Sequence, residues 1–112
     1  MTRIKSKAQV NHRKTKKLTK GFKQARRTRI KAGKEAAMHA GRYAYVGRKL
    51  RKRDLRALWI VRISALAKEN GISYSKFIKG LKENKIEIDR KMLSEIAVKD
   101  PKTFQEIVEN IK

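Results

Sequence analysis

The stretch RYAYVGRKLRKRDLRALWIVR, residues 42–62, is where this chain changes character. Its first part is dense in arginine and lysine, and its last part contains LWIV, residues 58–61, the most apolar block of the chain. The stretch contains no proline, and many of its residues are strong helix formers. We therefore predict one helix that binds a polyanion near its start and packs into a hydrophobic core near its end.

Charge is unevenly distributed along the 112 residues. Residues 1–56 hold 21 Lys or Arg and two acids, a net charge of +19, whereas residues 57–112 hold 11 Lys or Arg and eight acids, a net charge of +3. Self-repulsion of this size opposes compaction unless a polyanion offsets it. We therefore predict a basic nucleic-acid-binding extension with a long-helix arm over residues 1–56, and a self-folding domain over residues 57–112.

Three features narrow the class of protein. A basic N-terminus also occurs in organellar targeting peptides, but here the density of cations does not fall after residue 34, which disfavours that alternative. The chain has no cysteine, which rules out disulfides and thiolate zinc sites and fits a reducing compartment. No apolar run approaches the ~20 residues of a membrane-spanning helix, and we expect no membrane partner.

The basic half is predicted to contain one long helix. Residues 1–19 show no sustained period, and we expect them to be disordered in the free protein and extended or locally helical when bound. Gly21 predicts a bend over residues 20–22. From about Gln24 the composition favours a helix that ends near Asn70-Gly71, a typical C-terminal stop, with three internal glycines as candidate bends.

The apolar surface of this helix is narrow at first. Tyr43, Val46 and Leu50 form a stripe at i, i+3 and i+7, and cations cover much of the remaining circumference. Such a helix is not expected to pack against its own protein along its whole length. A second apolar face follows further along, and we expect its Trp59 to join the core.

After residue 70 the sequence predicts three short helices in an all-α C-terminal domain. Ser73, Asp89 and Asp100 can cap their N-termini, and Pro101 suits the first turn of the third helix. Each helix carries apolar residues at helical spacing, among them Met92, which we expect to face inward. The isoleucines just before Asp89 are expected to fill the core.

The residues give no support to an enzyme. We find no partner at metal-ligand spacing for His12 or His39, no nucleophile–base pair, and no phosphate-binding loop of the GxxxxGK[ST] type. We therefore expect no catalytic residue, no metal, no cofactor and no small-molecule substrate.

Polyanion binding is indicated much more strongly. The clusters RRTR, residues 26–29, and RKLRKR, residues 48–53, place cations on several sides of a helix. A helix in one DNA groove needs cations mainly on one side, whereas a helix inserted between the backbones of a folded RNA needs them on several. Arginine suits bidentate phosphate contacts, and Tyr43 or Tyr45 could stack on unpaired bases, although Tyr43 could instead belong to the apolar stripe.

The predicted RNA-binding residues are the cations of the extension and arm together with one tyrosine and one later arginine. They are Arg3, Lys5, Arg13, Lys14, Lys17, Lys20, Arg26, Arg27, Arg29, Arg42, Tyr45, Arg48, Lys49, Arg51, Lys52, Arg53, Arg56 and Arg62.

Three segments closely resemble the bacterial ribosomal protein L20 family of the large subunit: residues 43–63, 70–81 (NGISYSKFIKGL) and 88–97 (IDRKMLSEIA). The corner at residues 20–22 is also similar, with Phe22 where the family usually has Tyr. Ser64 stands where many members carry Asn. The resemblance covers nearly the whole chain.

This resemblance implies a basic N-terminal extension, a long helix and a small all-helical C-terminal domain. It implies a structural constituent of the large ribosomal subunit that binds large-subunit (23S-type) rRNA directly, early in assembly, beside neighbouring large-subunit proteins. Its location would be the ribosome in the cytoplasm. Some members also repress translation of their own operon through the C-terminal domain, which makes autoregulation a further expectation.

Two alternatives belong to other classes. The short C-terminal helices could mimic a helix-turn-helix, which would suit a DNA-compacting or DNA-binding regulatory protein. Against this, Lys76, Lys79 and Lys82 are sparse, and no residue set is arranged to read base edges. A cationic helix on a membrane surface would need a broad apolar face, which residues 25–56 lack.

Overall fold

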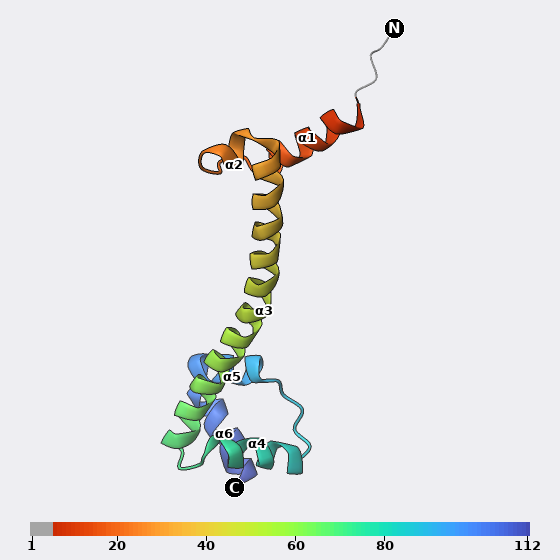
Figure 1. The fold of residues 1–112 in the computed structure, drawn as a ribbon. Helices are drawn as coiled ribbons and strands as arrows, with labels where there is room; N and C mark the ends of the chain where they lie inside the picture. Colours follow the sequence, from red (N-terminus) through yellow and green to blue (C-terminus); the bar gives the residue numbers. More distant parts are fainter. Residues whose placement is uncertain (1–5) are drawn as a thin grey trace. The chain divides into compact units, whose positions relative to one another are not determined.

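The computed structural model describes residues 6–112, which contain helices and no strand (Figure 1). This confirms the predicted all-α class. The helices are α1 (Lys7–Leu18), α2 (Ala25–Thr28), α3 (Ile30–Glu69), α4 (Tyr74–Glu83), α5 (Arg90–Lys99) and α6 (Pro101–Ile111).

The chain divides into two compact units, and α3 contributes to both. The N-terminal unit spans Met1–Lys49 and the C-terminal unit spans Leu50–Lys112. The boundary therefore falls within the 40-residue helix α3, inside the stretch where the sequence changes from cationic to apolar.

The long helix starts later than the sequence predicted. We placed its start near Gln24, which is wrong, because Gln24 has a positive φ of 54° and Arg29 is extended with φ −91° and ψ 129°. Gln24 precedes the single turn α2, and Arg29 separates that turn from α3. From Ile30 onward the helix is continuous, and neither Gly41 nor Gly47 interrupts it.

The predicted C-terminal end of α3 is confirmed. Gly71 has φ +78°, a conformation that glycine adopts without a side-chain clash. The Gly71 N–H donates to the Lys68 carbonyl at 3.0 Å, and the Ile72 N–H donates to the Ala67 carbonyl at 3.0 Å. These two bonds pair carbonyls that the helix leaves free at its end.

Residues 7–18 form α1, in a segment that we expected to be disordered when free and extended or locally helical when bound. The Ser6 hydroxyl accepts a hydrogen bond from the Gln9 N–H at 3.3 Å, and Lys16 and Lys17 occupy the last turn, where positive charge favours the helix dipole. The sequence of α1 has no apolar periodicity that would predict a helix, because its buried residue is the polar Thr15. The bend after α1 is confirmed: Gly21 has φ +88°, and the Phe22 N–H donates to the Thr19 carbonyl at 3.0 Å.

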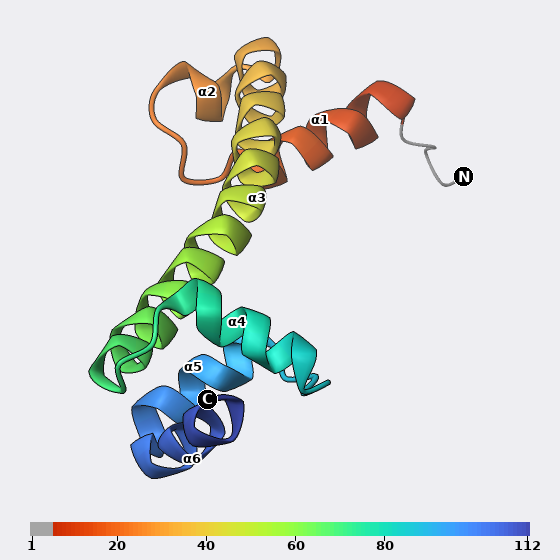
Figure 2. The same cartoon turned by 90° about the horizontal axis from the view of Figure 1, so that it is seen from below.

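The hydrophobic core lies in the C-terminal unit. Helix α6 packs against both α4 and α5 (Figure 2), and the rings of Phe77 and Phe104 stack with centroids 5.1 Å apart. Complete burial of a large apolar side chain contributes roughly 1.5–3 kcal/mol. The buried apolar residues are Ile63, Ala67, Phe77, Leu81, Leu93, Ala97, Phe104 and Val108.

All three predicted N-caps are confirmed. Ser73, Asp89 and Asp100 accept hydrogen bonds from the N–H groups three residues later, at 3.4, 2.8 and 3.3 Å. The Thr103 hydroxyl and backbone N–H both donate to Asp100 and lower the pKa of its carboxyl, because these bonds favour the charged form.

Two core expectations need correction. Met92 is 55% exposed, and the buried position beside Leu93 is held by Ser94, whose hydroxyl donates to the Lys91 carbonyl at 2.8 Å. Trp59 is only half-buried and lies outside the core cluster, which begins at Ile63. By contrast, the two isoleucines of the connection before Asp89 pack against the core as predicted.

Gly80 is a close-packing position on α4. A Cβ atom there would lie 1.8 Å from Cγ2 of Ile111 on α6, far inside van der Waals contact.

We predict that Gly80→Ala lowers the free energy of unfolding of the C-terminal unit by about 1–3 kcal/mol, measured by urea denaturation, because overpacking outweighs the better helix propensity of alanine. In an Ile111→Ala background, which removes the colliding methyl group, the same change should cost little or should stabilise. A stabilising effect of Gly80→Ala in the otherwise unchanged chain would contradict this packing.

Candidate nucleic-acid interface

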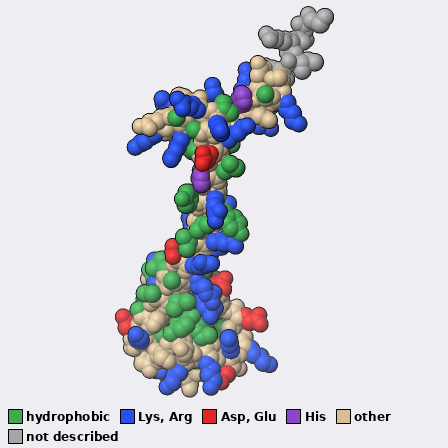
Figure 3. All heavy atoms as spheres, viewed as in Figure 1, with side chains coloured by type: hydrophobic (Ala, Val, Ile, Leu, Met, Phe, Trp, Pro, Cys, Tyr) green, Lys and Arg blue, Asp and Glu red, His purple; other side chains and the backbone are tan. Residues whose placement is uncertain are grey.

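The N-terminal unit carries most of the excess positive charge. Residues 1–49 contain 17 Lys or Arg and one acid, Glu35, a net charge of +16. Residues 50–112 contain 15 Lys or Arg and nine acids, a net charge of +6. Figure 3 shows the difference: basic side chains dominate α1 and α2, whereas acidic and basic side chains are interspersed over the C-terminal unit.

The same unit has no apolar core in its described part. Within residues 6–49 only Thr15, Thr19 and Gly33 are buried. Ordering the backbone costs about 1–2 kcal/mol per residue, which apolar burial normally offsets. Because this unit buries almost no apolar surface, we infer that its helices depend on local hydrogen bonds and on a polyanion that neutralises their charge.

A small joint holds α1, α2 and α3 together. A Cβ atom on Gly33 would lie 3.0 Å from the Arg26 carbonyl oxygen and 3.3 and 3.4 Å from the methyl groups of Thr15 and Thr19. The hydroxyls of the two threonines donate back along α1 to the carbonyls of Asn11 and Thr15, both at 3.0 Å. Their methyl groups thus face a glycine that allows α3 to approach closely.

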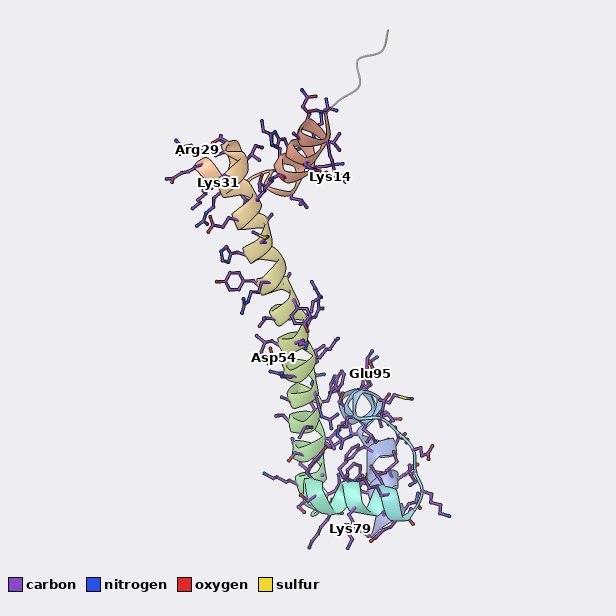
Figure 4. The ribbon with its side chains drawn as sticks, turned by 45° about the vertical axis from the view of Figure 1, so that its right-hand side comes forward. Lys14, Arg29, Lys31, Asp54, Lys79 and Glu95 are labelled. Carbon is purple, nitrogen blue, oxygen red and sulfur yellow. The ribbon has the colours of Figure 1, made fainter. Side chains whose placement is uncertain are left out.

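The predicted RNA-binding residues that the structure describes are all exposed. Arg3 and Lys5 lie outside the described residues. Figure 4 shows Lys14 on α1, and Arg29 close to Lys31 at the start of α3. The N-terminal unit holds Arg13, Lys14, Lys17, Lys20, Arg26, Arg27, Arg29, Arg42, Tyr45, Arg48 and Lys49, and the C-terminal unit holds Arg51, Lys52, Arg53, Arg56 and Arg62.

On α3 the cations occupy several sides of the helix. Successive residues are rotated by about 100°, so the five cations of residues 48–53 span an arc of about 200°, more than half of the circumference. The Lys49 ammonium lies 4.7 Å from the centroid of the Tyr45 ring, a cation–π contact that occupies one face of that ring.

Sequence reasoning missed several exposed cations of the N-terminal unit. One of them, Lys16, lines a hollow of about 350 Å³ between α1 and Ile30, the first residue of α3, together with the predicted Arg13. Composition alone could have indicated the missed cations, since every part of the unit is basic. The missed cations are Lys7, Lys16, Lys23, Lys31 and Lys34.

A larger cavity of about 580 Å³ lies between the α1–α2 connection, α2 and α3. It is lined by Phe22, Arg26, Ala32, Glu35, Ala36, His39, Ala40 and Tyr43.

One side of this cavity carries an acid–histidine pair. Glu35 Oε1 lies 4.0 Å from His39 Nε2, one helical turn apart, a spacing that we overlooked when we assigned neither histidine a partner. Tyr43 is 73% exposed, so it does not pack against its own protein as part of the stripe.

Residues 6–112 contain no group of three or more His, Cys, Asp or Glu side chains able to hold a metal ion. Nor does any helix in the same range combine the length and the apolar character that crossing a membrane requires.

Residues 3–107 match the family model described as Ribosomal protein L20. The chain belongs to the ribosomal protein L20 family. It is 55% identical over 105 residues to a large ribosomal subunit protein bL20 of Clostridium kluyveri, covering 94% of this chain and 88% of the relative. With the same coverage, it is 54% and 52% identical to the proteins of that name from Clostridium acetobutylicum and Alkaliphilus metalliredigens.

We predict that Gly33→Leu opens the joint of the N-terminal unit, because a leucine cannot fit between Thr15, Thr19 and the Arg26 carbonyl. Gly41→Leu is the matched control, since nothing lies within 4 Å of a Cβ atom there. Trypsin should then cleave at Lys20 and Lys23 several-fold faster in Gly33→Leu and at an unchanged rate in Gly41→Leu. Equal cleavage rates in the two variants would show that the joint does not depend on Gly33.

Proposed function

We propose that this chain is a structural constituent of the large ribosomal subunit that binds large-subunit rRNA directly and supports an early step of subunit assembly. Its family membership carries the proposal. The partners in this proposal are the 23S-type rRNA and neighbouring large-subunit proteins, and its location is the ribosome in the cytoplasm.

The charge of the N-terminal unit supports direct RNA binding. A net charge of +16 on helices with almost no buried side chain suits a segment that is surrounded by phosphates rather than by its own protein. Arginine and lysine on several sides of α3 can reach more than one RNA backbone at once. The extension and the arm of α3 as far as Arg56 would insert between RNA helices, while residues 57–112 would fold by themselves.

We favour a structural role over a catalytic one, because the family is named for its place in the ribosome. We also favour RNA over DNA. A helix that reads one DNA groove needs its cations mainly on the side facing that groove, and the run at residues 48–53 is not restricted to one side.

Salt dependence tests the proposal. If on the order of ten phosphates are contacted, the logarithm of the binding constant for naked large-subunit rRNA should fall with the logarithm of salt concentration at a slope of roughly −7 to −9. Replacing the five cations of residues 48–53 by glutamine should reduce the slope by about 4, at roughly 0.7–0.9 for each lost contact.

A matched control has the same charge change on the C-terminal unit: glutamine at Lys68, Lys76, Lys79, Lys82 and Lys102, which are all exposed. It should change the slope much less. A nearly flat salt response of the unmodified chain, or tighter binding to duplex DNA than to rRNA at matched salt, would contradict the proposal.

A further inference from the structure

The cavity of about 580 Å³ in the N-terminal unit combines three kinds of groups that suit a nucleobase. Phe22 and Tyr43 supply aromatic surface, Arg26 supplies a cation, and Glu35 supplies a carboxylate. Its volume falls within the range of about 300–1,000 Å³ that small-molecule sites usually have. Unstacked bases of single-stranded RNA are bound in this way, by stacking on aromatic rings and by hydrogen bonds along their edges.

Among the side chains that line the cavity, the carboxylate of Glu35 is the unexpected one. Glu35 is the first acid in the chain and the only one among residues 1–49, which carry 17 cations. In a unit that is to be surrounded by phosphates, a carboxylate is repelled unless it meets a hydrogen-bond donor. Figure 3 shows acidic and histidine side chains side by side on α3, and the 4.0 Å separation of Glu35 and His39 identifies the pair.

We propose that this cavity binds one unstacked guanine of the partner RNA, and that Glu35 accepts hydrogen bonds from the N1–H and the N2 amino group of that base. The inference rests on the proposed rRNA binding and adds the class of nucleotide that this one site takes. Tyr43 and Phe22 stack on or flank the base, and Arg26 contacts a phosphate next to it.

Guanine is the base that a carboxylate recognises best. Its Watson–Crick edge presents two adjacent donors, which match the two oxygens of an ionised carboxylate. Adenine and cytosine each place a ring-nitrogen acceptor beside their single amino donor, and uracil places its N3–H between two carbonyl oxygens. Each of these three bases would bring an acceptor close to Glu35.

The Glu35 side chain is 72% exposed and the His39 side chain is 64% exposed, so both can be reached by a ligand without unfolding α3. A bound base would exclude water from the carboxylate and strengthen its hydrogen bonds. His39 lies one turn along α3, with its Nε2 atom 4.0 Å from Oε1 of Glu35, and lines the same cavity.

Short oligouridine RNAs that differ only in their central base test the proposal with the full chain. The RNA with a central guanine should bind about 5- to 100-fold more tightly than those with adenine, cytosine or uracil, the discrimination typical of one bidentate contact. An RNA with central inosine, which lacks only the N2 amino group, should fall between guanine and the rest. Fluorescence anisotropy at fixed salt would give the dissociation constants.

Glu35→Gln should remove the guanine preference, leaving all four standard RNAs bound within about twofold of one another, because an amide cannot accept both bonds. Asp54→Asn is the control: Asp54 is an exposed acid of α3 outside the cavity, and its loss changes the net charge by the same amount. This control should keep the preference. Far-UV circular dichroism would check that both variants retain their helices.

Equal binding of the four RNAs by the unmodified chain, an unchanged preference in Glu35→Gln, or equal binding of inosine and guanine would each overturn the assignment. Any of these results, with steep salt-dependent rRNA binding intact, would refute the guanine site alone. Loss of rRNA binding by the unmodified chain would refute the proposed function instead.

Discussion

Electrostatic repulsion within the N-terminal unit is the constraint on which the rest of this structure depends. Seventeen cations and one acid lie within 49 residues, and the described part of that segment buries two threonines and a glycine. Neither apolar burial nor ion pairing compensates: the acidic contact found in residues 6–49 places Glu35 4.0 Å from His39, and both side chains are exposed. Self-repulsion of this size opposes compaction, and we therefore infer that this segment is stabilised by the phosphates of a bound RNA.

The C-terminal unit, by contrast, is stabilised by contacts within the unit itself. Nine acids offset more than half of its 15 cations, each of its short helices has a side-chain cap, and Phe77 and Phe104 stack within the core. In the described residues no buried side-chain polar atom is left without a hydrogen-bond partner. We infer from these features that the unit folds from its own interactions, while α3 extends the same backbone into the cationic unit.

Much of the fold could be predicted from the sequence because its signals are local. Ser73, Asp89 and Asp100 cap helices where their spacing from the apolar residues indicated, and Gly71 ends α3 as expected. The start of α3 could not be placed, because the break depends on the conformations of Gln24 and Arg29, residues with no strong turn preference. The sequence also allowed us to predict that the candidate site binds a polyanion, because the net charge of a segment can be counted without a structure.

The missed features depend on contacts between helices. Gly33 looked like a helix-weakening residue until Thr15, Thr19 and the Arg26 carbonyl were found against it. Gly80 gained its meaning from Ile111, 31 positions further along the chain. Glu35 is the single acid among residues 1–49, and its proposed role follows from the cavity that it shares with Phe22 and Tyr43.

Amide hydrogen exchange of the full chain, followed residue by residue with and without large-subunit rRNA, tests the central claim most directly. Without RNA, at low salt, the amides of α1, α2 and the first part of α3 should exchange much faster than those around the core of the C-terminal unit. Addition of rRNA should then protect them strongly. Equal protection of the two units without RNA, unchanged when RNA is added, would show that the cationic unit holds its own structure and would contradict the account.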